Sequence, residues 1–477
     1  MNTLIDTLVI GSGFGGSVVA ARLVEAGAKV TLLERGPWRD TAALAAYALP
    51  DKAPLPQGRH LPTHLLRQLS VAATGQTSTL QRDGFFDIHV DGGMTCVASS
   101  GVGGGSHVYL AMNMRPEQAD YWEGRAAGIT AAAMEPHYDW MLQRMGSRTA
   151  QAQDRAPNLI AERFADDAAI DTSVPQPALG FRFGGPYGNN AFLGDTAGRK
   201  VTLDALLLAP LLDRGLTVLD RHEAVSVSRE GKHWRVEVRD ERHDRQRFLR
   251  ARRVVLAAGT LNTLRLLRRS ERKGGLGSLP GLGQGFSGNG DVFALWRAGE
   301  QGEDFRAGPP CLGRFTLKDE PGSPMLYALG LNGIDAIPGL PEALRRRVAD
   351  WLVLVGMGRD EANGRIGWKG DTPRIGYQEH NNPVMGRIHS ALGKLARRSG
   401  RRVLAVPPSV TVHPLGGARV GDDPQTSVIN HRGEVHGHPG LYISDGSALP
   451  AAPGTPPSMT IAAWAGHVSQ HLLATGI

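Results

Sequence analysis

The strongest constraint on the fold is a glycine-rich stretch near the start of the chain. A short apolar run leads directly into residues 11–16, which read GSGFGG. In a strand–loop–helix unit, Gly11 permits a tight turn and Gly13 lets the backbone approach a pyrophosphate, while Gly16 lets the helix pack closely on the strand. The pattern predicts a Rossmann-type strand, a dinucleotide-binding loop, and a helix over residues 17–26.

An acidic residue at the expected distance supports this interpretation. Glu34 ends the second apolar run, residues 30–33, where a Rossmann domain places the carboxylate that accepts hydrogen bonds from ribose hydroxyls. The helix N-terminus would offer its free N–H groups to the phosphates. The loop alone does not separate NAD from FAD. Its position at the start of the chain favours FAD, because many FAD enzymes begin with the nucleotide-binding unit and return to it later.

Length and composition are those of an ordinary globular protein. The 477 residues are enough for two domains, and 41% are hydrophobic and 21% charged. No apolar run is long enough to span a bilayer, and the first apolar stretch is the predicted Rossmann strand. We therefore expect no signal peptide and a cytoplasmic location. Cys96 and Cys311 are the only cysteines, so we expect neither a disulfide framework nor a metal site.

The basic balance of the chain does not indicate nucleic-acid binding. The formal net charge is +7 and the pI is about 9.6. The basic residues are scattered, with short clusters at residues 345–347 and 397–402, and no basic stripe alternates with aromatic residues. This pattern is typical of solvated helix faces, so we expect no nucleic-acid partner. Weak contact with an anionic membrane surface stays open.

The remaining pattern predicts one parallel sheet and a second region of mixed structure. The run at residues 254–259 is continuously apolar, as in a parallel strand buried on both faces. Further strands are expected at residues 216–219, 224–227, 234–238, 246–249 and 441–446, and helices at 201–212, 261–268 and 458–473. Residues 38–91 are expected to form loops and short helices that cover a site, and residues 116–145 to be helical in pieces.

Five ordered blocks of sequence resemble the glucose–methanol–choline (GMC) oxidoreductases, and within them the cholesterol oxidase branch. The first block is the N-terminal loop. The others are residues 101–109 (GVGGGSHVY), 257–263 (AAGTLNT), 413–417 (HPLGG), and 442–450 (YISDGSALP) followed by 460–463 (TIAA). They are similar to the family's flavin loop, its strand-to-helix segment, its active-site histidine segment and its C-terminal signature. The stretch 116–198 and the second domain match poorly.

The resemblance implies FAD, bound non-covalently. The ADP half would lie on Gly11, Gly13, Phe14, Gly15 and Glu34, the adenine on the backbone of Val225, the isoalloxazine along Gly105, Tyr109, Leu110 and Met112, and the ribityl chain near Asp445 and Gly446. Further cofactor-binding candidates on the matching blocks are Ser12, Gly16, Arg35, Gly103, Ala258 and Pro456. The physical logic agrees, because a bulky flavin needs loops without Cβ atoms where its face meets backbone. Asp445 also follows a strand, where open α/β sheets bind ligands.

The resemblance makes His413 the catalytic candidate. Alcohol oxidation removes an O–H proton and transfers a C–H hydride to flavin N5, and an imidazole can hold the hydroxyl oxygen and take its proton near neutral pH. Other histidines (His107, His431, His436, His438 and His467) have no comparable context and are interpreted as structural or surface residues. A hydrolase based on Ser106 is disfavoured because no G-x-S-x-G elbow is present.

Two departures from the family pattern concern the substrate. The family usually places an Asn or second His where this chain has Pro456, which offers no side-chain donor. Thr455, Ser458 or a residue of the second domain is the expected substitute. Cholesterol oxidases also use a carboxylate to move the steroid double bond, and the matching stretch here, residues 327–331, contains no acid. Asp335 is the nearest acid in sequence.

Together these observations predict an α/β protein with a discontinuous Rossmann-type FAD-binding domain and a mixed sheet-and-helix substrate domain. We expect the first to comprise residues 1–45, 90–115, 195–295 and 408–477, the second 116–194 and 296–407, and a loop lid 46–89. The expected activity is oxidation of a hydrophobic, steroid-like or terpenoid alcohol, with oxygen or another acceptor. A flavin-dependent isomerase or desaturase and a redox-silent flavin-binding protein are the alternatives.

Overall fold

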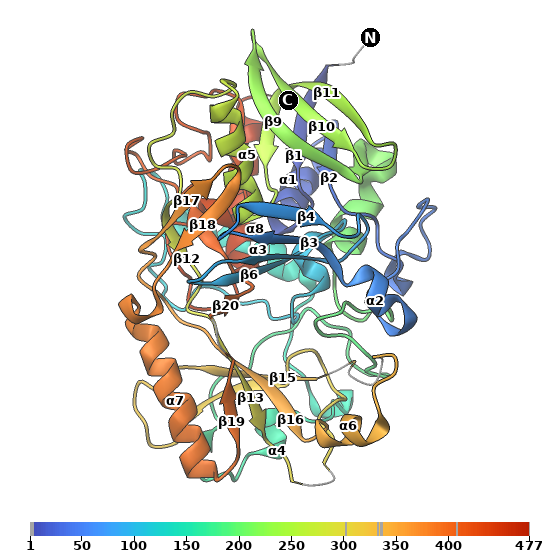
Figure 1. The fold of residues 1–477 in the computed structure, drawn as a ribbon, viewed down its shortest axis with the longest axis vertical. Coiled ribbons are helices and arrows are strands. Elements are labelled where there is room, and N and C mark those ends of the chain that lie inside the picture. The colour runs from blue at the N-terminus through green and yellow to red at the C-terminus, as the bar shows by residue number, and fades with distance from the viewer. Residues whose placement is uncertain (1–3, 301–302, 332, 334–336, 407–408, 477) are drawn as a thin grey trace.

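The protein has two lobes in Figure 1. The upper lobe contains a seven-stranded sheet, and the lower lobe contains a six-stranded sheet. The computed structural model describes residues 4–300, 303–331, 333, 337–406 and 409–476. The order across the sheet is β8 (Leu216–Asp220), β2 (Val30–Glu34), β1 (Ile5–Ile10), β11 (Arg245–Leu256), β10 (His233–Asp240) and β9 (His222–Glu230), with β22 (Leu441–Ile443) paired to β11. β1 runs parallel to β2 and β11, and β10 pairs antiparallel with β9 and β11. The predicted Rossmann-type fold is confirmed.

Four long helices pack around this sheet. They are α1 (Phe14–Glu25), α3 (Ala131–Met145), α5 (Thr260–Arg272) and α8 (Ser458–Ala474). α8 contacts both α1 and α3, and α5 packs on β9. Trp122 stacks on Trp464 of α8, with ring centroids 6.0 Å apart. No helix in the described ranges combines the length and apolar character needed to cross a bilayer.

The segment expected to be a loop lid contains strands instead. A five-stranded sheet has the order β20 (Val410–Thr411), β6 (Thr95–Ser99), β5 (Phe86–Val90), β3 (Leu66–Val71) and β4 (Gln76–Thr79), preceded by the short α2 (Leu61–His64). The expectation of loops over residues 46–89 was wrong because buried positions of β3 are polar. Arg67, Gln68 and Ser70 are all buried there, so the strand lacks apolar alternation.

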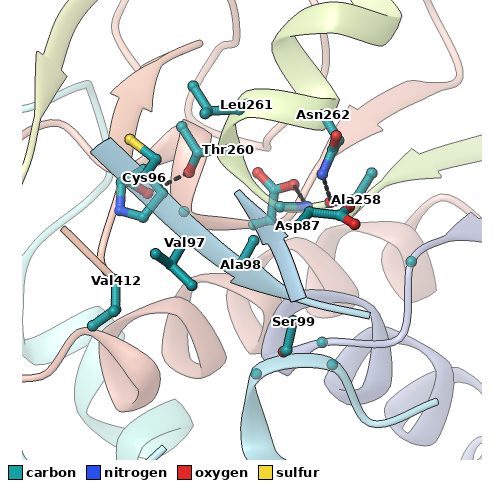
Figure 2. A pocket seen from close by; sticks show the side chains of 18 of the residues that line it. Asp87, Cys96, Val97, Ala98, Ser99, Ala258, Thr260, Leu261, Asn262 and Val412 are labelled. Atoms are coloured by element: carbon teal, nitrogen blue, oxygen red, sulfur yellow. Dashed lines mark hydrogen bonds between the residues drawn. The ribbon is translucent and has the colours of Figure 1, made fainter. Parts of the chain in front are cut away.

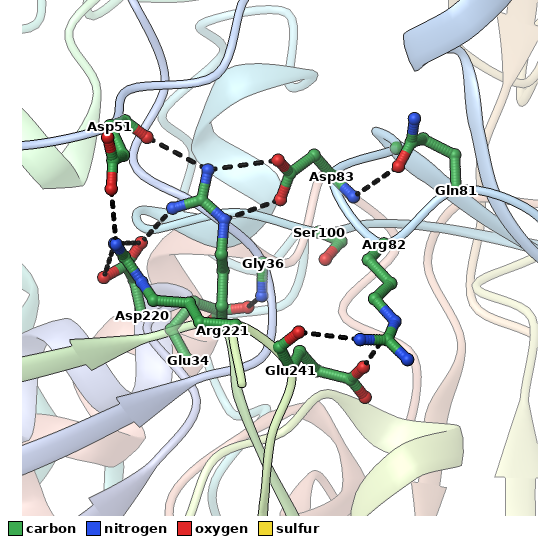
Figure 3. Close-up of polar contacts among 12 residues, drawn as sticks. Glu34, Gly36, Asp51, Gln81, Arg82, Asp83, Ser100, Asp220, Arg221 and Glu241 are labelled. Atoms are coloured by element: carbon green, nitrogen blue, oxygen red, sulfur yellow. Dashed lines mark hydrogen bonds and ion pairs between the residues drawn. The ribbon is translucent and has the colours of Figure 1, made fainter. Parts of the chain in front are cut away.

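An ionic network ties this part of the chain to the Rossmann sheet (Figure 3). Arg221, just after β8, donates from Nε to Asp83 at 2.7 Å, from Nη1 to Asp220 at 2.7 Å and from Nη2 to the carbonyl of Asp51 at 3.0 Å. Arg39 is fully buried and donates to the carbonyls of Asp83, Gly84 and Ser100, each at 2.8 Å. These guanidinium groups add charge-assisted hydrogen bonds to the apolar contacts that Trp38, Leu44 and Met94 make with the upper core.

The lower lobe has its own sheet and core. Its six strands are β19 (Val403–Ala405), β13 (Val292–Arg297), β16 (Trp351–Gly356), β15 (Leu326–Gly330), β14 (Gly313–Leu317) and β7 (Ile170–Asp171), all antiparallel. α7 (Pro383–Ser399), α4 (Ile160–Arg163) and α6 (Glu342–Arg347) accompany it (Figure 1). Trp296, Phe315 and Ile388 are buried in a cluster separate from the upper core.

The observed elements divide the chain differently from the expected domains. A four-stranded sheet joins β18 (Thr372–Gly376), β17 (Gly364–Lys369), β12 (Gln284–Ser287) and β21 (Leu415–Gly417). Ile366 and Ile375 of this sheet, and Met134 of α3, belong to the upper core, although both regions were expected in the substrate domain. Conversely, β13 lies in the lower sheet. The helix expected at residues 201–212 is a π-helical turn followed by a 3-10 helix.

The last part of the chain contributes to every sheet of the described structure. Within residues 403–443, β19 pairs with β13, β20 with β6, β21 with β12, and β22 with β11. Each of the four sheets therefore contains one strand from this short segment and strands from much earlier in the sequence.

Two buried histidines between α3 and α8 predict a loss of stability in mild acid. His137 and His467 have ring centroids 5.9 Å apart, and burial lowers the pKa of each to about 4. Between about pH 6.5 and about pH 4 the unfolded chain therefore binds more protons than the folded one, so the free energy of unfolding falls as the pH falls through this window. Urea midpoints measured from pH 7 to pH 4 should show this decline. It should be shallower in His137→Leu and unchanged in a variant of the exposed His380. Equal slopes in His137→Leu and the unchanged protein would contradict the assignment.

Candidate active site

One large cavity lies where the carboxyl ends of the parallel strands meet the lower lobe. Its volume is about 460 Å³, and Ile10, Glu34 and Ala257 mark the ends of β1, β2 and β11 on its wall. This is the edge at which open α/β sheets bind ligands. Figure 2 shows Cys96, Val97, Ala98 and Ser99 of β6 on the cavity wall together with Thr260, Leu261 and Asn262 at the start of α5.

Most of the predicted site residues line this cavity. They are Gly11, Ser12, Gly13, Phe14, Gly15, Glu34, Arg35, Gly105, Tyr109, Leu110, Met112, Val225, Ala258, His413, Asp445, Gly446 and Pro456. Two predicted residues do not line it. Gly16 is a packing position, because a Cβ there would lie 1.9 Å from the carbonyl oxygen of Gly11. Gly103 has a φ of +97° and donates its N–H to the Ser12 hydroxyl at 3.1 Å, so it shapes the second glycine loop.

Gly13 shows that the glycine loop is built around a ligand. Its φ of −70° and ψ of −166° are open to any residue, and an added Cβ would meet no protein atom within 4 Å. Neither backbone conformation nor packing therefore requires glycine there. Gly13 is the N-cap of α1 and makes no side-chain cap, so no capping side chain occupies the first N–H groups of the helix, and the first helical residues Phe14 and Gly15 line the cavity. These are the properties of a pyrophosphate cradle.

Glu34 is held in place by the loop that it faces. Its Oε2 accepts hydrogen bonds from the Ser12 backbone at 3.1 Å and the Ser12 hydroxyl at 2.6 Å, and Oε1 accepts from the Gly36 N–H at 2.9 Å (Figure 3). A carboxylate has about four acceptor positions, so capacity is left for a ribose hydroxyl. The acid is thus preorganised for the role that the sequence predicts.

Asp445 closes the cavity on the other side of the loop. Its Oδ2 accepts from the Gly259 N–H at 2.9 Å and the Thr263 hydroxyl at 2.5 Å, and its Oδ1 accepts from the Ser447 N–H at 3.0 Å. Burial raises the pKa of this carboxyl, while these hydrogen bonds lower it. The side chain joins the end of β22 to the start of α5, and its neighbour Gly446 also lines the cavity.

The second glycine loop carries the residues expected beside the isoalloxazine. An added Cβ at Gly105 would meet no protein atom within 4 Å, as at Gly13. Tyr109 is clamped by the segment after Gly198: its hydroxyl donates to the carbonyl of Val201 at 2.7 Å, and Lys200 Nζ donates to its carbonyl at 3.0 Å. Burial lowers the pKa of Lys200 to about 7. These two hydrogen bonds hold Tyr109, at the end of the second glycine loop, against the segment 200–201.

His413 lies in the cavity wall with one ring nitrogen engaged. Its Nδ1 lies 3.0 Å from both carboxylate oxygens of Asp291, which is fully buried, whereas the imidazole is 21% exposed. Sequence reasoning missed Asp291, because it precedes the histidine by more than a hundred residues and no motif connects them. The only local signal was an acid in a glycine-rich turn directly before β13.

The segment around Pro456 offers one of the two hydroxyl side chains expected to replace the missing family side chain. Pro456 lines the cavity, but the Thr455 hydroxyl donates to the carbonyl of Arg115 at 2.9 Å, and Thr455 is not part of the cavity wall. The Ser458 hydroxyl is 3.5 Å from the carbonyl of Met112. Of the expected substitutes, Thr455 is therefore not supported by the geometry, whereas Ser458 lines the cavity and stays a candidate.

The structure adds polar wall residues that the sequence did not indicate. Gln68, Ser70 and His89 of the five-stranded sheet line the cavity, as does Arg265 of α5. Asp87 forms an ion pair with Arg35 at 2.5 Å. These residues were missed because the strands that carry them were expected to be loops.

Two family models match this chain. The model of the N-terminal part of the GMC oxidoreductases matches residues 5–287, and the model of the C-terminal part matches residues 401–465. The chain belongs to the GMC oxidoreductase family, and it is an FAD-dependent oxidoreductase that acts on CH–OH groups.

Within the family the chain is cholesterol oxidase-like. It is 26% identical to a cholesterol oxidase of Mycobacterium tuberculosis over an alignment of 559 residues, which covers 96% of this chain and 89% of the relative. A short stretch of 53 residues, 11% of this chain and 10% of the relative, is 45% identical to paromamine 6'-oxidase of Streptomyces fradiae.

Solved structures share the fold. Pyridoxine 4-oxidase from Mesorbium loti gives a TM-score of 0.66 at 17% identity and covers 98% of this chain and 99% of its own. A fungal aryl-alcohol oxidase gives a TM-score of 0.61 at 15% identity, with 99% and 100% covered.

The surroundings of Cys96 and His107, the two nucleophilic side chains close to the second glycine loop in sequence, predict that FAD is bound without a covalent link. Cys96 lines the cavity, but burial raises the pKa of its thiol, and a thiolate is the reactive form. His107 is buried outside the cavity wall, with Nε2 2.7 Å from the carbonyl oxygen of Val102. Acid precipitation should therefore release all of the yellow colour into the supernatant, as FAD by chromatography. Colour retained in the pellet would contradict this prediction.

Proposed function

We propose that this enzyme oxidises a hydrophobic alcohol, with His413 taking the hydroxyl proton while the C–H hydride leaves for the cofactor. The observation that carries the proposal is the position of His413. It lines the same cavity as the glycines of the first loop (Gly11, Gly13 and Gly15) and the apolar side chains of Phe293 and Val355. With FAD bound, flavin N5 supplies the hydride acceptor. The protein's own part is to hold the alcohol, orient its hydroxyl and move its proton.

The apolar wall supports a hydrophobic substrate. Phe293 of β13, Val355 of β16 and Met357 reach the cavity from the lower lobe, and Phe192 and Val412 join them. The exposed apolar surface of such a wall favours a ligand that buries hydrocarbon. The wall includes no basic side chain from the six-stranded sheet, among the residues that the structure describes. A charged substrate would find no partner on this side.

His413 is suited to act on the hydroxyl. The two nitrogens of imidazole lie on opposite edges of the ring, so when Nδ1 faces Asp291, Nε2 faces away from it. An alcohol bound against the apolar wall can donate its O–H to Nε2 and lose the proton there as the hydride departs. Exclusion of water by the surrounding apolar residues strengthens this interaction.

An anaerobic reduction screen tests the proposal. The purified holoenzyme is mixed without oxygen with cholesterol, a terpenoid secondary alcohol, an aryl alcohol, pyridoxine and an aminoglycoside, and loss of flavin absorbance near its long-wavelength maximum is followed. We expect fast bleaching by one or more of the hydrophobic alcohols. Bleaching only by the two polar alcohols, or by none of the five, would overturn the proposed substrate class. Readmission of oxygen then shows whether oxygen is the acceptor.

The cavity wall further predicts that a steroid double bond is not moved efficiently. Such a shift needs a base to carry a proton between carbons, and a carboxylate in an apolar pocket suits this task. Residues 326–330 form β15, which is fully buried and does not line the cavity. The carboxylates on the described wall, Glu34, Asp87, Glu223 and Asp445, all lie outside the lower sheet.

Supplying a Δ5-3-ketosteroid tests this prediction. We expect the ultraviolet absorbance of the conjugated enone to rise no faster than with heat-denatured enzyme. Asp335 lies outside the described residues, so the variant Asp335→Asn is the matching control. Rapid enone formation that Asp335→Asn abolishes would refute the prediction and identify the base.

A further inference from the structure

Asp291 is held as a fixed carboxylate behind His413. Its side chain is 0% exposed and is absent from the cavity wall. Its Oδ2 accepts hydrogen bonds from the Thr411 hydroxyl at 2.8 Å and the Val412 N–H at 3.2 Å. The backbone N–H of His413 in turn donates to Thr411 Oγ1 at 2.9 Å. The acid is therefore bound to the same segment, residues 411–413, that carries the histidine.

Among the residues that the structure describes, the charge of Asp291 has one neighbour within ion-pair distance that can become a cation. In the described part of the chain no lysine or arginine forms an ion pair with it, and its one ion-pair partner is His413, at 3.0 Å. The segment packed against Asp291 contributes the Thr411 hydroxyl, the Val412 N–H and the His413 imidazole to the surroundings of the carboxylate. A buried carboxylate without a permanent counter-ion is costly unless hydrogen bonds and a cation compensate it. Here the compensating cation can arise only by protonation of the imidazole.

We propose that Asp291 is a positioning residue that fixes His413 as the Nδ1–H tautomer, with an unprotonated Nε2 toward the cavity. When Nε2 accepts the proton of the substrate hydroxyl, the resulting imidazolium donates from Nδ1 to the carboxylate, which stabilises the new positive charge. Asp291 keeps no proton in this step. The inference rests on the proposed function, because it assigns the second group that the proton transfer requires.

This arrangement accounts for the missing side chain at Pro456. With a proline there and the Thr455 hydroxyl bound to backbone, Ser458 is the one hydroxyl side chain of residues 455–458 on the cavity wall, and a neutral hydroxyl supplies no negative charge to the imidazole. The charge compensation of His413 then comes from behind the ring. Asp291 provides it through the two 3.0 Å contacts to Nδ1.

The tautomer can be measured directly on the holoenzyme. Nitrogen-15 NMR of histidine-labelled protein distinguishes Nδ1–H from Nε2–H imidazoles, and comparison with His413→Gln assigns the His413 signal. We expect Nδ1–H in the unchanged enzyme and loss of that preference in Asp291→Asn. An Nε2–H tautomer in the unchanged enzyme would overturn the inference, even if Asp291→Asn failed to fold.

Kinetics of the same variants provide the second readout. With the alcohol that bleaches the flavin fastest in the screen above, Asp291→Asn should lower the rate at saturation by about 10²–10³-fold, with KM changed less than about threefold and FAD content retained. Asp360→Asn is the matched control. Asp360 is also buried, and it binds the Gly288 N–H of the same turn at 3.1 Å, but it does not contact His413. Asp360→Asn should lower the free energy of unfolding and leave the rate at saturation within about threefold of that of the unchanged enzyme.

The outcomes separate the two proposals. Normal rates in Asp291→Asn together with a slow His413→Ala would overturn the positioning role and leave the proposed function standing. Normal rates in both variants would overturn the proposed base itself, and with it the role of Asp291. An equal fall in Asp291→Asn and Asp360→Asn would show that the turn is only structural.

Discussion

Replacing His413 with alanine should lower turnover by about 10²–10⁴-fold while leaving FAD bound, which is the usual cost of losing a general acid–base group. The imidazole lies in the cavity wall and is not part of the glycine loop at residues 11–16, so we expect the cofactor contacts of that loop not to depend on it. The rate of anaerobic flavin reduction by a saturating alcohol gives the measurement, and the ratio of flavin to protein absorbance gives occupancy.

Two further variants sharpen this expectation. His413→Gln keeps a hydrogen-bonding side chain and should retain more activity than the alanine variant. His438→Ala removes a partly buried histidine outside the cavity wall and should be close to normal. Near-normal turnover in His413→Ala with full flavin content would show that the histidine is structural.

Gly13→Val should abolish FAD binding without unfolding the apoprotein. The backbone angles at Gly13 suit valine, and its Cβ would meet no protein atom within 4 Å, so the free energy of unfolding of the apoprotein should change by less than about 0.5 kcal/mol. The valine side chain would instead fill the space where the pyrophosphate approaches the helix N-terminus. We expect FAD affinity to fall by at least about 10²-fold.

Gly15→Val is the informative contrast. A Cβ at Gly15 would lie 2.4 Å from the carbonyl oxygen of Ser444, so this variant should destabilise the apoprotein as well as weaken FAD binding. Thermal unfolding of both apoproteins, followed by fluorescence titration with FAD, distinguishes the two effects. Unchanged FAD affinity in Gly13→Val would mean that the pyrophosphate does not lie at this loop.

The sequence was most informative where local pattern and function coincide. The glycine loop, Glu34 and the strand before Asp445 were predictable because each has a fixed spacing from a strand end, and the structure places all of them on one cavity. The strands at residues 66–90 were not predictable, because Arg67 and Arg39 are buried among backbone carbonyls and carboxylates instead of apolar neighbours. In β5 apolar and polar residues do alternate, but the polar Asp87 and His89 are the buried ones, so the hydrophobic pattern does not indicate which face is buried.

Pairing between segments far apart in the sequence explains the other differences between the expected and the observed structure. β17 and β18 look like part of the second domain in sequence order, but β17 pairs with β12 and their apolar side chains enter the upper core. Asp291 acquires its neighbour His413 only through the return of the chain at β20 and β21. Such contacts between distant segments are fixed by topology, which no local motif encodes.

The strands of residues 403–443 have a consequence for biosynthesis. A nascent chain that has not yet reached this segment has four sheets with an unpaired edge each and no His413. Unpaired edges favour association with other chains, and contacts of such large sequence separation form slowly. We therefore expect that cofactor loading follows the synthesis of residues 403–443, and that truncations before residue 443 give aggregated, colourless protein. Supply of chaperones and flavin late in synthesis should then set the yield of active enzyme more than the rate of translation does.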